Sequence, residues 1–127
     1  MIRKVLIVDD SNLVHSMYRQ MLNKYDCEFL DAMNGMEALK LVEQENDIDL
    51  ILLDVDMPVM NGLRFLEQYK GNPSGAQIPI IVISTLGKEK DIKRGLELGA
   101  AGYIIKPFEP QNLHTLIDKI FSGTSQN

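Results

Sequence analysis

The sequence predicts an α/β domain of the doubly wound type, in which helices cover both faces of a five-stranded parallel sheet. Short runs rich in Val, Ile and Leu alternate along the chain with longer segments whose apolar residues recur at helical spacing. The runs "VLIV", "LILL" and "IIVI" are apolar throughout, which is typical of strands buried on both faces. Strict alternation of strand and helix favours right-handed crossovers between parallel strands.

The strands follow directly from these apolar and β-branched runs. They are predicted at residues 4–8, 27–32, 50–53, 80–83 and 102–105. Cys27 is expected to be a small residue of the second strand.

The helices fill the segments between the strands. Ser11 is a candidate N-cap for the first helix, whose apolar stripe comprises Val14, Met17, Tyr18, Met21 and Leu22. The other helices are predicted at residues 35–45, 62–70, 88–98 and 110–121. His15 and His114 fall outside the apolar stripes and are predicted to be surface residues.

Length and composition fit one domain. The chain has 127 residues, of which 45% are hydrophobic. We expect the domain at residues 1–122 and a flexible tail or linker stub at 123–127, and a loop at 71–77. The single cysteine excludes an internal disulfide, and two histidines leave no zinc-type cluster.

Charge and hydropathy narrow the class of partner. A formal net charge of -5 argues against direct nucleic-acid binding, which requires excess Lys and Arg. No apolar run approaches the roughly 20 residues that span a bilayer, so membrane insertion is not expected. The start "MIRKVLIVDD" reaches carboxylates too early for a signal peptide, which predicts a cytoplasmic protein.

The candidate functional residues follow the strands, at the edge where open parallel sheets bind ligands. They are Asp9 and Asp10 after the first strand, Asp54 after the third, Ser84 and Thr85 after the fourth, and Lys106 after the fifth. Clustered acids repel one another and do not stabilise the core. Several carboxylates beside a lysine instead suit Mg²⁺ together with a phosphoryl group.

These residues lie in motifs that resemble the receiver domains of two-component response regulators. The resemblance runs from "KVLIVDDS" through "LILLDVDMPVMNG" and "IIVIST" to "GAAGYIIKPFEP". It implies the flavodoxin/CheY-like (βα)5 fold with strand order 2-1-3-4-5. It also implies a protein that catalyses only its own aspartyl phosphorylation and dephosphorylation and does not turn over an external substrate.

The resemblance assigns roles to the acids. Asp54 resembles the phosphoacceptor of the family. Asp9 and Asp10 resemble the acidic pair that holds Mg²⁺, or Mn²⁺ in its place, together with Asp54 and the main-chain carbonyl of Asp56. Asp54 is already ionised when it attacks, so no general base is needed.

The other site residues are also assigned by resemblance. Lys106 corresponds to the lysine that pairs with the phosphoryl group, Ser84 to the switch hydroxyl, and Tyr103 to the switch aromatic. The implied backbone contacts to the phosphoryl group come from Val55, Asp56 and Thr85, and the implied cis-proline is Pro107.

The implied partners are a sensor histidine kinase or phosphotransfer protein and an unidentified output partner. Phosphorylation is expected to change the surface of the fourth helix, the fifth strand and the fifth helix, through which a homodimer is one candidate assembly. The segment "KEKDIKR" lies on that surface and otherwise has the charge pattern of a solvated helix face.

Three alternative interpretations fit the sequence less well. "ILLDVD" resembles the nucleophile motif of haloacid dehalogenase-like phosphatases, in which Asp54 would attack and Asp56 would act as acid and base. That motif normally lies on the first strand, whereas here an acidic pair precedes it. A phosphorylation-independent receiver is disfavoured by the complete residue set. A flavin-binding domain is disfavoured because two acids stand where its phosphate loop would be.

Overall fold

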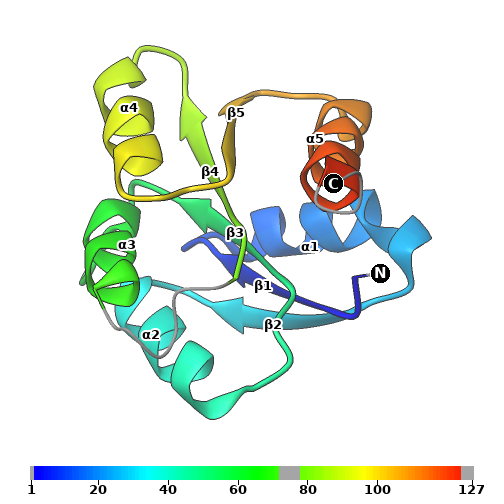
Figure 1. The fold of residues 1–127 in the computed structure, drawn as a ribbon, viewed down its shortest axis with the longest axis horizontal. Coiled ribbons are helices and arrows are strands. Elements are labelled where there is room, and N and C mark those ends of the chain that lie inside the picture. Colours follow the sequence, from blue (N-terminus) through cyan, green and yellow to red (C-terminus); the bar gives the residue numbers. More distant parts are fainter. Residues whose placement is uncertain (1, 72–77, 124–127) are drawn as a thin grey trace.

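A parallel sheet with helices on both faces positions every candidate residue (Figure 1). The computed structural model describes residues 2–71 and 78–123. Within them the strands are β1 (Lys4–Val8), β2 (Glu28–Ala32), β3 (Leu50–Asp54), β4 (Ile80–Thr85) and β5 (Gly102–Lys106). The helices are α1 (Asn12–Met21), α2 (Gly35–Gln44), α3 (Gly62–Lys70), α4 (Glu89–Glu97) and α5 (Pro110–Gly123), with a short 3-10 turn, η1 (Asn23–Tyr25).

The strand order is β2-β1-β3-β4-β5, which confirms the predicted doubly wound fold. All neighbouring strands are parallel. The three central strands carry the apolar runs seen in the sequence, and β3 is buried along its whole length. Asp54 is therefore the last residue of the central strand of the sheet.

The two faces of the sheet bury separate apolar layers. On β1, Leu6 and Val8 pack with residues of α2 and α3, whereas Val5 and Ile7 pack with residues of α1 and α5. Figure 1 shows the same division, with α2, α3 and α4 on one side of the sheet and α1 and α5 on the other. This alternation follows from the two-residue period of a strand.

Side-chain caps start three of the helices near the carboxyl edge of the sheet. Ser11 accepts a hydrogen bond from the main-chain nitrogen of Val14, as its position in the sequence predicts. Asn34 and Asn61 cap α2 and α3 in the same way. The loops that precede these helices are thereby held close to the strand ends.

The predicted element boundaries are shifted by one or two residues. β3, β4 and β5 continue to Asp54, Thr85 and Lys106, because the ladder still pairs Asp54 with Ile83 and Thr85 with Lys106. Cys27 lies one residue before β2 and is half-buried. Of the predicted loop at 71–77 and the predicted tail at 123–127, residues 72–77 and 124–127 lie outside the described residues.

The prediction that His15 is a surface residue is wrong. Its exposed fraction is 3%, whereas that of Met17 is 42%. The buried face of α1 is formed by His15, Tyr18 and Leu22, which are spaced three and four residues apart. His114 is half-buried, and its Nε2 contacts the main-chain carbonyl of Met21.

None of the helices in the described part of the chain is both long enough and apolar enough to cross a membrane.

Candidate functional site

Three carboxylates meet where β1 and β3 end. Asp9, Asp10 and Asp54 each place one oxygen so that all three oxygens lie within 4.8 Å of one another. Asp9 and Asp54 are buried, whereas Asp10 is exposed. The parallel sheet accounts for this convergence, because the carboxyl ends of adjacent strands reach the same edge.

Asp9 is held by the backbone around it. Its main-chain nitrogen donates to the carbonyl of Ala32, and its Oδ1 accepts a hydrogen bond of 2.9 Å from the main-chain nitrogen of Ser11. Its Oδ2 is buried and has no hydrogen-bond partner in the described residues. A buried carboxylate oxygen is costly to leave without a hydrogen bond, so this position suits a cation.

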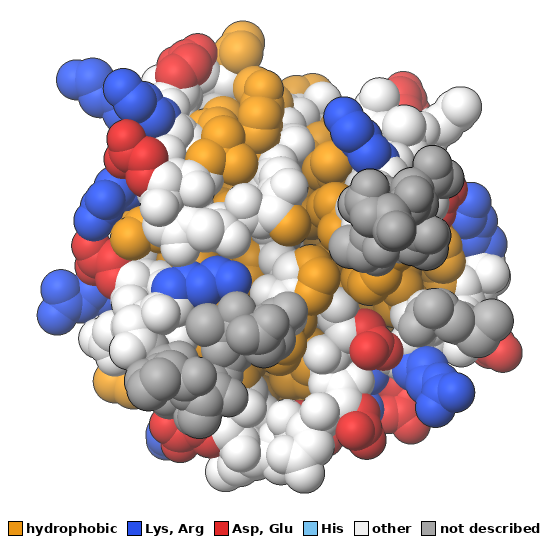
Figure 2. Space-filling view, in the orientation of Figure 1, with side chains coloured by type: hydrophobic (Ala, Val, Ile, Leu, Met, Phe, Trp, Pro, Cys, Tyr) orange, Lys and Arg blue, Asp and Glu red, His pale blue; other side chains and the backbone are white. Residues whose placement is uncertain are grey.

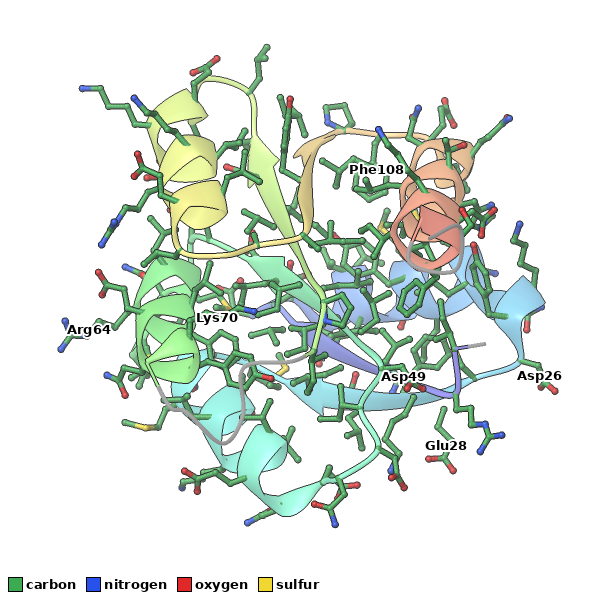
Figure 3. The ribbon with its side chains drawn as sticks, viewed as in Figure 1. Asp26, Glu28, Asp49, Arg64, Lys70 and Phe108 are labelled. Carbon is green, nitrogen blue, oxygen red and sulfur yellow. The ribbon has the colours of Figure 1, made fainter. Side chains whose placement is uncertain are left out.

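Lys106 supplies the positive charge of the site. Its Nζ lies 3.2 Å from Oδ1 of Asp54 and 3.6 Å from Oδ2 of Asp9. Lys106 ends β5, and the next peptide bond, to Pro107, is cis. Phe108 then packs against Tyr18 of α1 with 6.2 Å between the ring centroids, and Figure 3 shows Phe108 between β5 and α5.

The carboxyl group of Asp54 is strongly perturbed by its surroundings. Burial is the main cause and raises the pKa of Asp54 from its ordinary value to about 6. Lys106 lowers the pKa in part, while the charges of Asp9 and Asp10 raise it. The positive charge of Lys106 therefore does not offset the burial of Asp54 and the charges of its acidic neighbours, and a divalent cation would supply the rest.

The loop after β3 brings its backbone close to Asp54. The main-chain nitrogen of Gly62 donates to the carbonyl of Val55 at 2.9 Å, and a Cβ at Gly62 would overlap the carbonyl of Asp54. Only glycine fits this approach. Val59, in the same loop, has a φ of 68° and is exposed.

The side chain of Asp56 is directed away from the acidic cluster. Its carboxylate lies 3.7 Å from Nζ of Lys88, and 62% of the side chain is exposed. It is also absent from the group of acids that could share a metal ion. The haloacid dehalogenase-like alternative needs Asp56 as the acid and base beside Asp54, and the observed position does not suit that role.

The end of β4 provides two hydroxyl groups with different surroundings. Ser84 is buried, and its Oγ has no hydrogen-bond partner in the described part of the chain. Thr85 is exposed at the end of the strand. On the adjacent strand β5, 46% of Tyr103 is exposed.

A hollow of about 1120 Å³ lies at the opposite edge of the sheet, away from the acidic cluster. It includes Asp26, Glu28 and Asp49, which Figure 3 shows far from α4. Asp49 already accepts hydrogen bonds from the main-chain nitrogens of Arg3 and Lys4, and Glu28 lies 3.8 Å from Nζ of Lys4.

The structure thus brings Asp9, Asp10, Asp54 and Lys106 together. Ser84 lies on the strand next to β3, and Tyr103 lies at the surface. The sequence analysis missed His15, whose Nε2 is 2.7 Å from the carbonyl oxygen of Asp9. The signal that could have revealed it is its spacing from Tyr18 and Leu22, which places it on the buried face of α1.

Comparison with known proteins identifies the family. The model of the response regulator receiver domain matches residues 5–118. The chain belongs to this family. Receiver domains of this kind act in two-component signal transduction with a histidine kinase as partner, and they are not turnover enzymes on external substrates.

Similar proteins include both single-domain and longer regulators. The receiver domain is 33% identical to the chemotaxis protein CheY of Halobacterium salinarum, over 97% of this chain and all of that protein. It is 33% identical to the probable transcriptional regulator ycf29 of Pyropia yezoensis, over 94% of this chain but only 53% of that protein. The chain therefore spans about half the length of one relative and the whole length of another.

Solved structures agree with this assignment. A putative response regulator from Chloroflexus aurantiacus has a TM-score of 0.87 at 30% identity, covering 96% of this chain and 99% of that one. The chemotaxis protein CheY4 of Vibrio cholerae has a TM-score of 0.83 at 31% identity, covering 94% and 99%. Nothing in these comparisons supports the phosphatase alternative.

Proposed function

We propose that Asp54 of this receiver domain accepts a phosphoryl group from a phosphohistidine of its partner kinase. The observation that carries the proposal is the meeting of Asp9, Asp10, Asp54 and Lys106 at one sheet edge. Within the described residues, the buried Oδ2 of Asp9 also has no hydrogen-bond partner. One Asp54 oxygen attacks phosphorus, a P–O bond forms, and the P–N bond to the histidine breaks. The released imidazole nitrogen keeps the electron pair and takes a proton from solvent.

The residues present fit a magnesium site. Asp9, Asp10 and Asp54 offer the oxygen ligands that Mg²⁺ prefers, and we assign the main-chain carbonyl of Asp56 as a further ligand. When bound, the ion offsets the negative charge that develops on the transferred oxygens. Mn²⁺ has similar ligand preferences and is expected to substitute.

The chain's own groups orient the phosphoryl group from the other side. Lys106, already within ion-pair distance of Asp54, is placed to bind a phosphoryl oxygen. Ser84 has a buried hydroxyl with no hydrogen-bond partner among residues 2–71 and 78–123, and it is suited to donate a second hydrogen bond. The backbone nitrogens of Val55, Asp56 and Thr85 are the remaining proposed contacts.

The proposed response lies at the surface of α4, β5 and α5. If Ser84 turns toward the phosphoryl group, Tyr103 can fill the space beside it, and the surface near Tyr103 changes. A groove of about 400 Å³ between α4 and β5 is lined by Ile92, Leu96 and Tyr103, among others. Figure 2 shows hydrophobic side chains gathered between α4 and β5, with charged side chains beside them. An output partner, or a second copy of the chain, is proposed to bind there.

The assignment is tested by labelling with acetyl phosphate in the presence of Mg²⁺. The parent protein should gain one acid-labile phosphoryl group, and Asp54→Asn should gain none. Asp56→Asn is the matched control and should still be labelled, because its carboxylate lies outside the cluster. Undiminished labelling of Asp54→Asn would overturn the assignment. Loss of labelling in Asp56→Asn, with steady phosphatase turnover by the parent, would instead favour the phosphatase alternative.

A further inference from the structure

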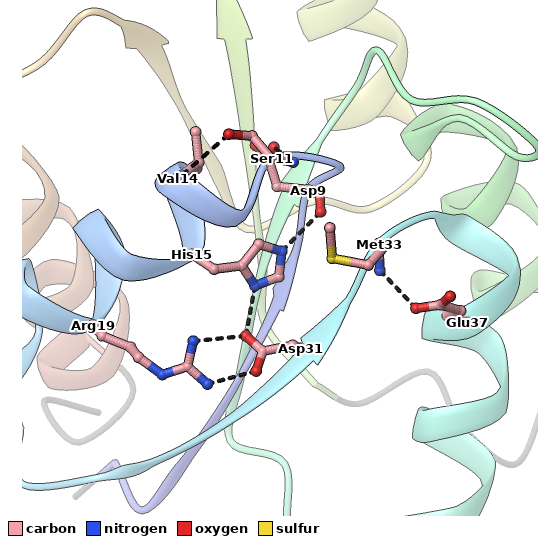
Figure 4. Close-up of polar contacts among 8 residues, drawn as sticks. All are labelled: Asp9, Ser11, Val14, His15, Arg19, Asp31, Met33 and Glu37. Carbon is pink, nitrogen blue, oxygen red and sulfur yellow. Dashed lines mark hydrogen bonds and ion pairs between the residues drawn. The ribbon is translucent and has the colours of Figure 1, made fainter.

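A buried histidine connects the acidic cluster to the edge of the sheet. His15 lies on α1, with Nδ1 2.6 Å from Oδ1 of Asp31 and Nε2 2.7 Å from the main-chain oxygen of Asp9. Figure 4 shows the ring between these two residues. The exposed fraction of His15 is only 3%, so the ring itself is shielded from water, whereas Asp31 is partly exposed.

Both partners of the His15 ring are hydrogen-bond acceptors. A main-chain carbonyl cannot donate, and Asp31 is held as a carboxylate. Its two oxygens accept from Arg19 at 2.9 Å and 2.5 Å. The hydrogen bond from Arg19 is the main cause that lowers the pKa of Asp31, and His15 adds to it. Because a carbonyl oxygen can only accept, Nε2 of His15 is the donor in its contact with Asp9, and the contacts at the two ring nitrogens together fix the plane of the ring.

The carbonyl that accepts from His15 belongs to the peptide bond that joins Asp9 to Asp10. The nitrogen of Asp9 is bonded to Ala32 and its Oδ1 to the nitrogen of Ser11, so the contact with His15 fixes the remaining main-chain polar group of Asp9. Rotation of this peptide plane would redirect the side chain of Asp10, the one exposed acid of the cluster.

We propose that His15 is a positioning residue for the cation site: by donating to the carbonyl of Asp9, it holds Asp9 and Asp10 in the orientation that binds Mg²⁺. Asp31 and Arg19 hold His15 in turn. The inference rests on the proposed function in that Mg²⁺ is the ion taken. Groups that orient metal ligands typically change metal affinity on the order of 10- to 100-fold when they are removed.

A purely structural role makes a different prediction. His15 also ties α1 to β2 through Asp31, and loss of that tie alone would lower stability without changing the Mg²⁺ affinity of the folded protein. The chain supplies a matched control, because His114 makes a similar contact from Nε2 to the carbonyl of Met21, at the other end of α1. Substitution of His114 therefore shows whether the loss of a histidine-to-carbonyl contact far from the acidic cluster changes Mg²⁺ affinity.

The experiment compares the parent, His15→Phe, His15→Gln and His114→Phe. Mg²⁺ affinity is measured by following amide NMR shifts during a titration, and amide exchange of Asp10 and Ser11 is measured in chelator. His15→Phe should weaken Mg²⁺ about tenfold and speed exchange at Asp10 and Ser11. His15→Gln keeps an N–H donor and should recover part of the affinity. His114→Phe should match the parent within twofold.

A folded His15→Phe whose Mg²⁺ affinity is within twofold of that of His114→Phe would overturn the inference. If His15→Phe does not fold, Asp31→Ala decides, because Asp31 is half-exposed. It should weaken Mg²⁺ at least threefold relative to Asp118→Ala, which removes the partner of Tyr25 instead. An unchanged affinity would again overturn the inference.

Failure of the proposed function would look different. A parent that binds no Mg²⁺ would overturn the metal site and this inference together. Labelling that survives in Asp54→Asn would overturn only the phosphoacceptor assignment, since the effect of His15 on Mg²⁺ affinity would be unaffected.

Discussion

Lys106 reaches Asp54 across an intervening strand. Lys106 ends the edge strand β5 and Asp54 ends the central strand β3, with β4 between them, yet Nζ and Oδ1 are 3.2 Å apart. The same Nζ lies 3.6 Å from Asp9 on β1. One lysine thus faces three acids at this edge, counting Asp10. The site has an excess of negative charge, and the first predictions follow from that excess.

Neutralising one acid should stabilise the protein in chelator. In Asp10→Asn and Asp54→Asn, repulsion within the cluster falls, so the melting temperature should rise above that of the parent. Mg²⁺ at ten times its dissociation constant should stabilise the parent by about 1.4 kcal/mol, and the variants by less. Thermal melts at fixed ionic strength measure both effects. Less stable Asn variants, with no Mg²⁺ shift in the parent, would show that the acids are structural caps.

The stability of the metal-free protein should depend on the ionisation of Asp54. Because burial raises the pKa of Asp54 in the fold to about 6, the folded state keeps a proton that the unfolded chain loses near pH 4. Stability from this group is complete below about pH 4 and is lost as the pH rises through about 6, by on the order of 3 kcal/mol. The Asp54→Asn protein has no carboxyl group at this position, so it should not lose stability in this way as the pH rises.

Urea unfolding in chelator from pH 4 to pH 7 measures the difference between Asp54→Asn and the parent. The free energy of unfolding of the variant, relative to that of the parent, should increase as the pH rises and should become constant above about pH 7. Asp56→Asn, changed at an exposed side chain, should not reproduce this dependence. A difference that is constant with pH would contradict the perturbed ionisation of Asp54.

Ser84→Ala should abolish the response at Tyr103 without lowering the stability of the protein. The buried Oγ of Ser84 has no partner in the described residues, so its removal should leave the stability of the unphosphorylated protein unchanged or slightly raised. After addition of beryllofluoride, a phosphoryl mimic, the NMR signals of Tyr103 should shift in the parent but not in Ser84→Ala. Thr85→Ala, at the exposed hydroxyl, is the control. If the Tyr103 signals shift equally in Ser84→Ala and in the parent, Ser84 is not required for the response.

Val59→Asn should stabilise the fold. Val59 has a φ of 68°, in the left-handed region where a β-branched residue is strained and Asn is tolerated. Relief of this strain should add about 1 kcal/mol to the free energy of unfolding. Leu86→Asn also replaces an exposed apolar residue, but one without a positive φ, and should change stability by under about 0.5 kcal/mol. Equal effects of the two substitutions would show that exposure, not backbone strain, is responsible.

The sequence predicted the fold and the convergence at the sheet edge for one physical reason. Parallel strands end at a common edge, so the positions of Asp9, Asp54 and Lys106 at strand ends predict that they lie at one edge, while the strand order came from the family resemblance. The burial of His15 could not be predicted in this way, because its partner Asp31 lies on another element. A polar residue is read as solvent-facing unless its hydrogen-bond partners are known.

Two other features also escaped the sequence analysis. Pro58 restricts its own φ and the residue before it, but it does not dictate the left-handed conformation of Val59. The ion pair between Asp56 and Lys88 joins two loops whose separation is known only once the strands are paired. Both features depend on loop geometry, which hydrophobic periodicity does not encode.

The central strand β3 separates two groups of candidate functional residues on the two halves of the sheet. Asp54 has β1 and the acidic pair that follows it on one side, where His15 of α1 contacts Asp9. On the other side are β4 and β5, with Ser84 and Tyr103. Under the proposed function, residues on the β1 side set ion affinity, residues on the β5 side set partner choice, and Lys106 links the two halves through Asp54 and Asp9. On this division, the proposed phosphoryl chemistry at the centre of the sheet can be combined with different partner surfaces at its edge.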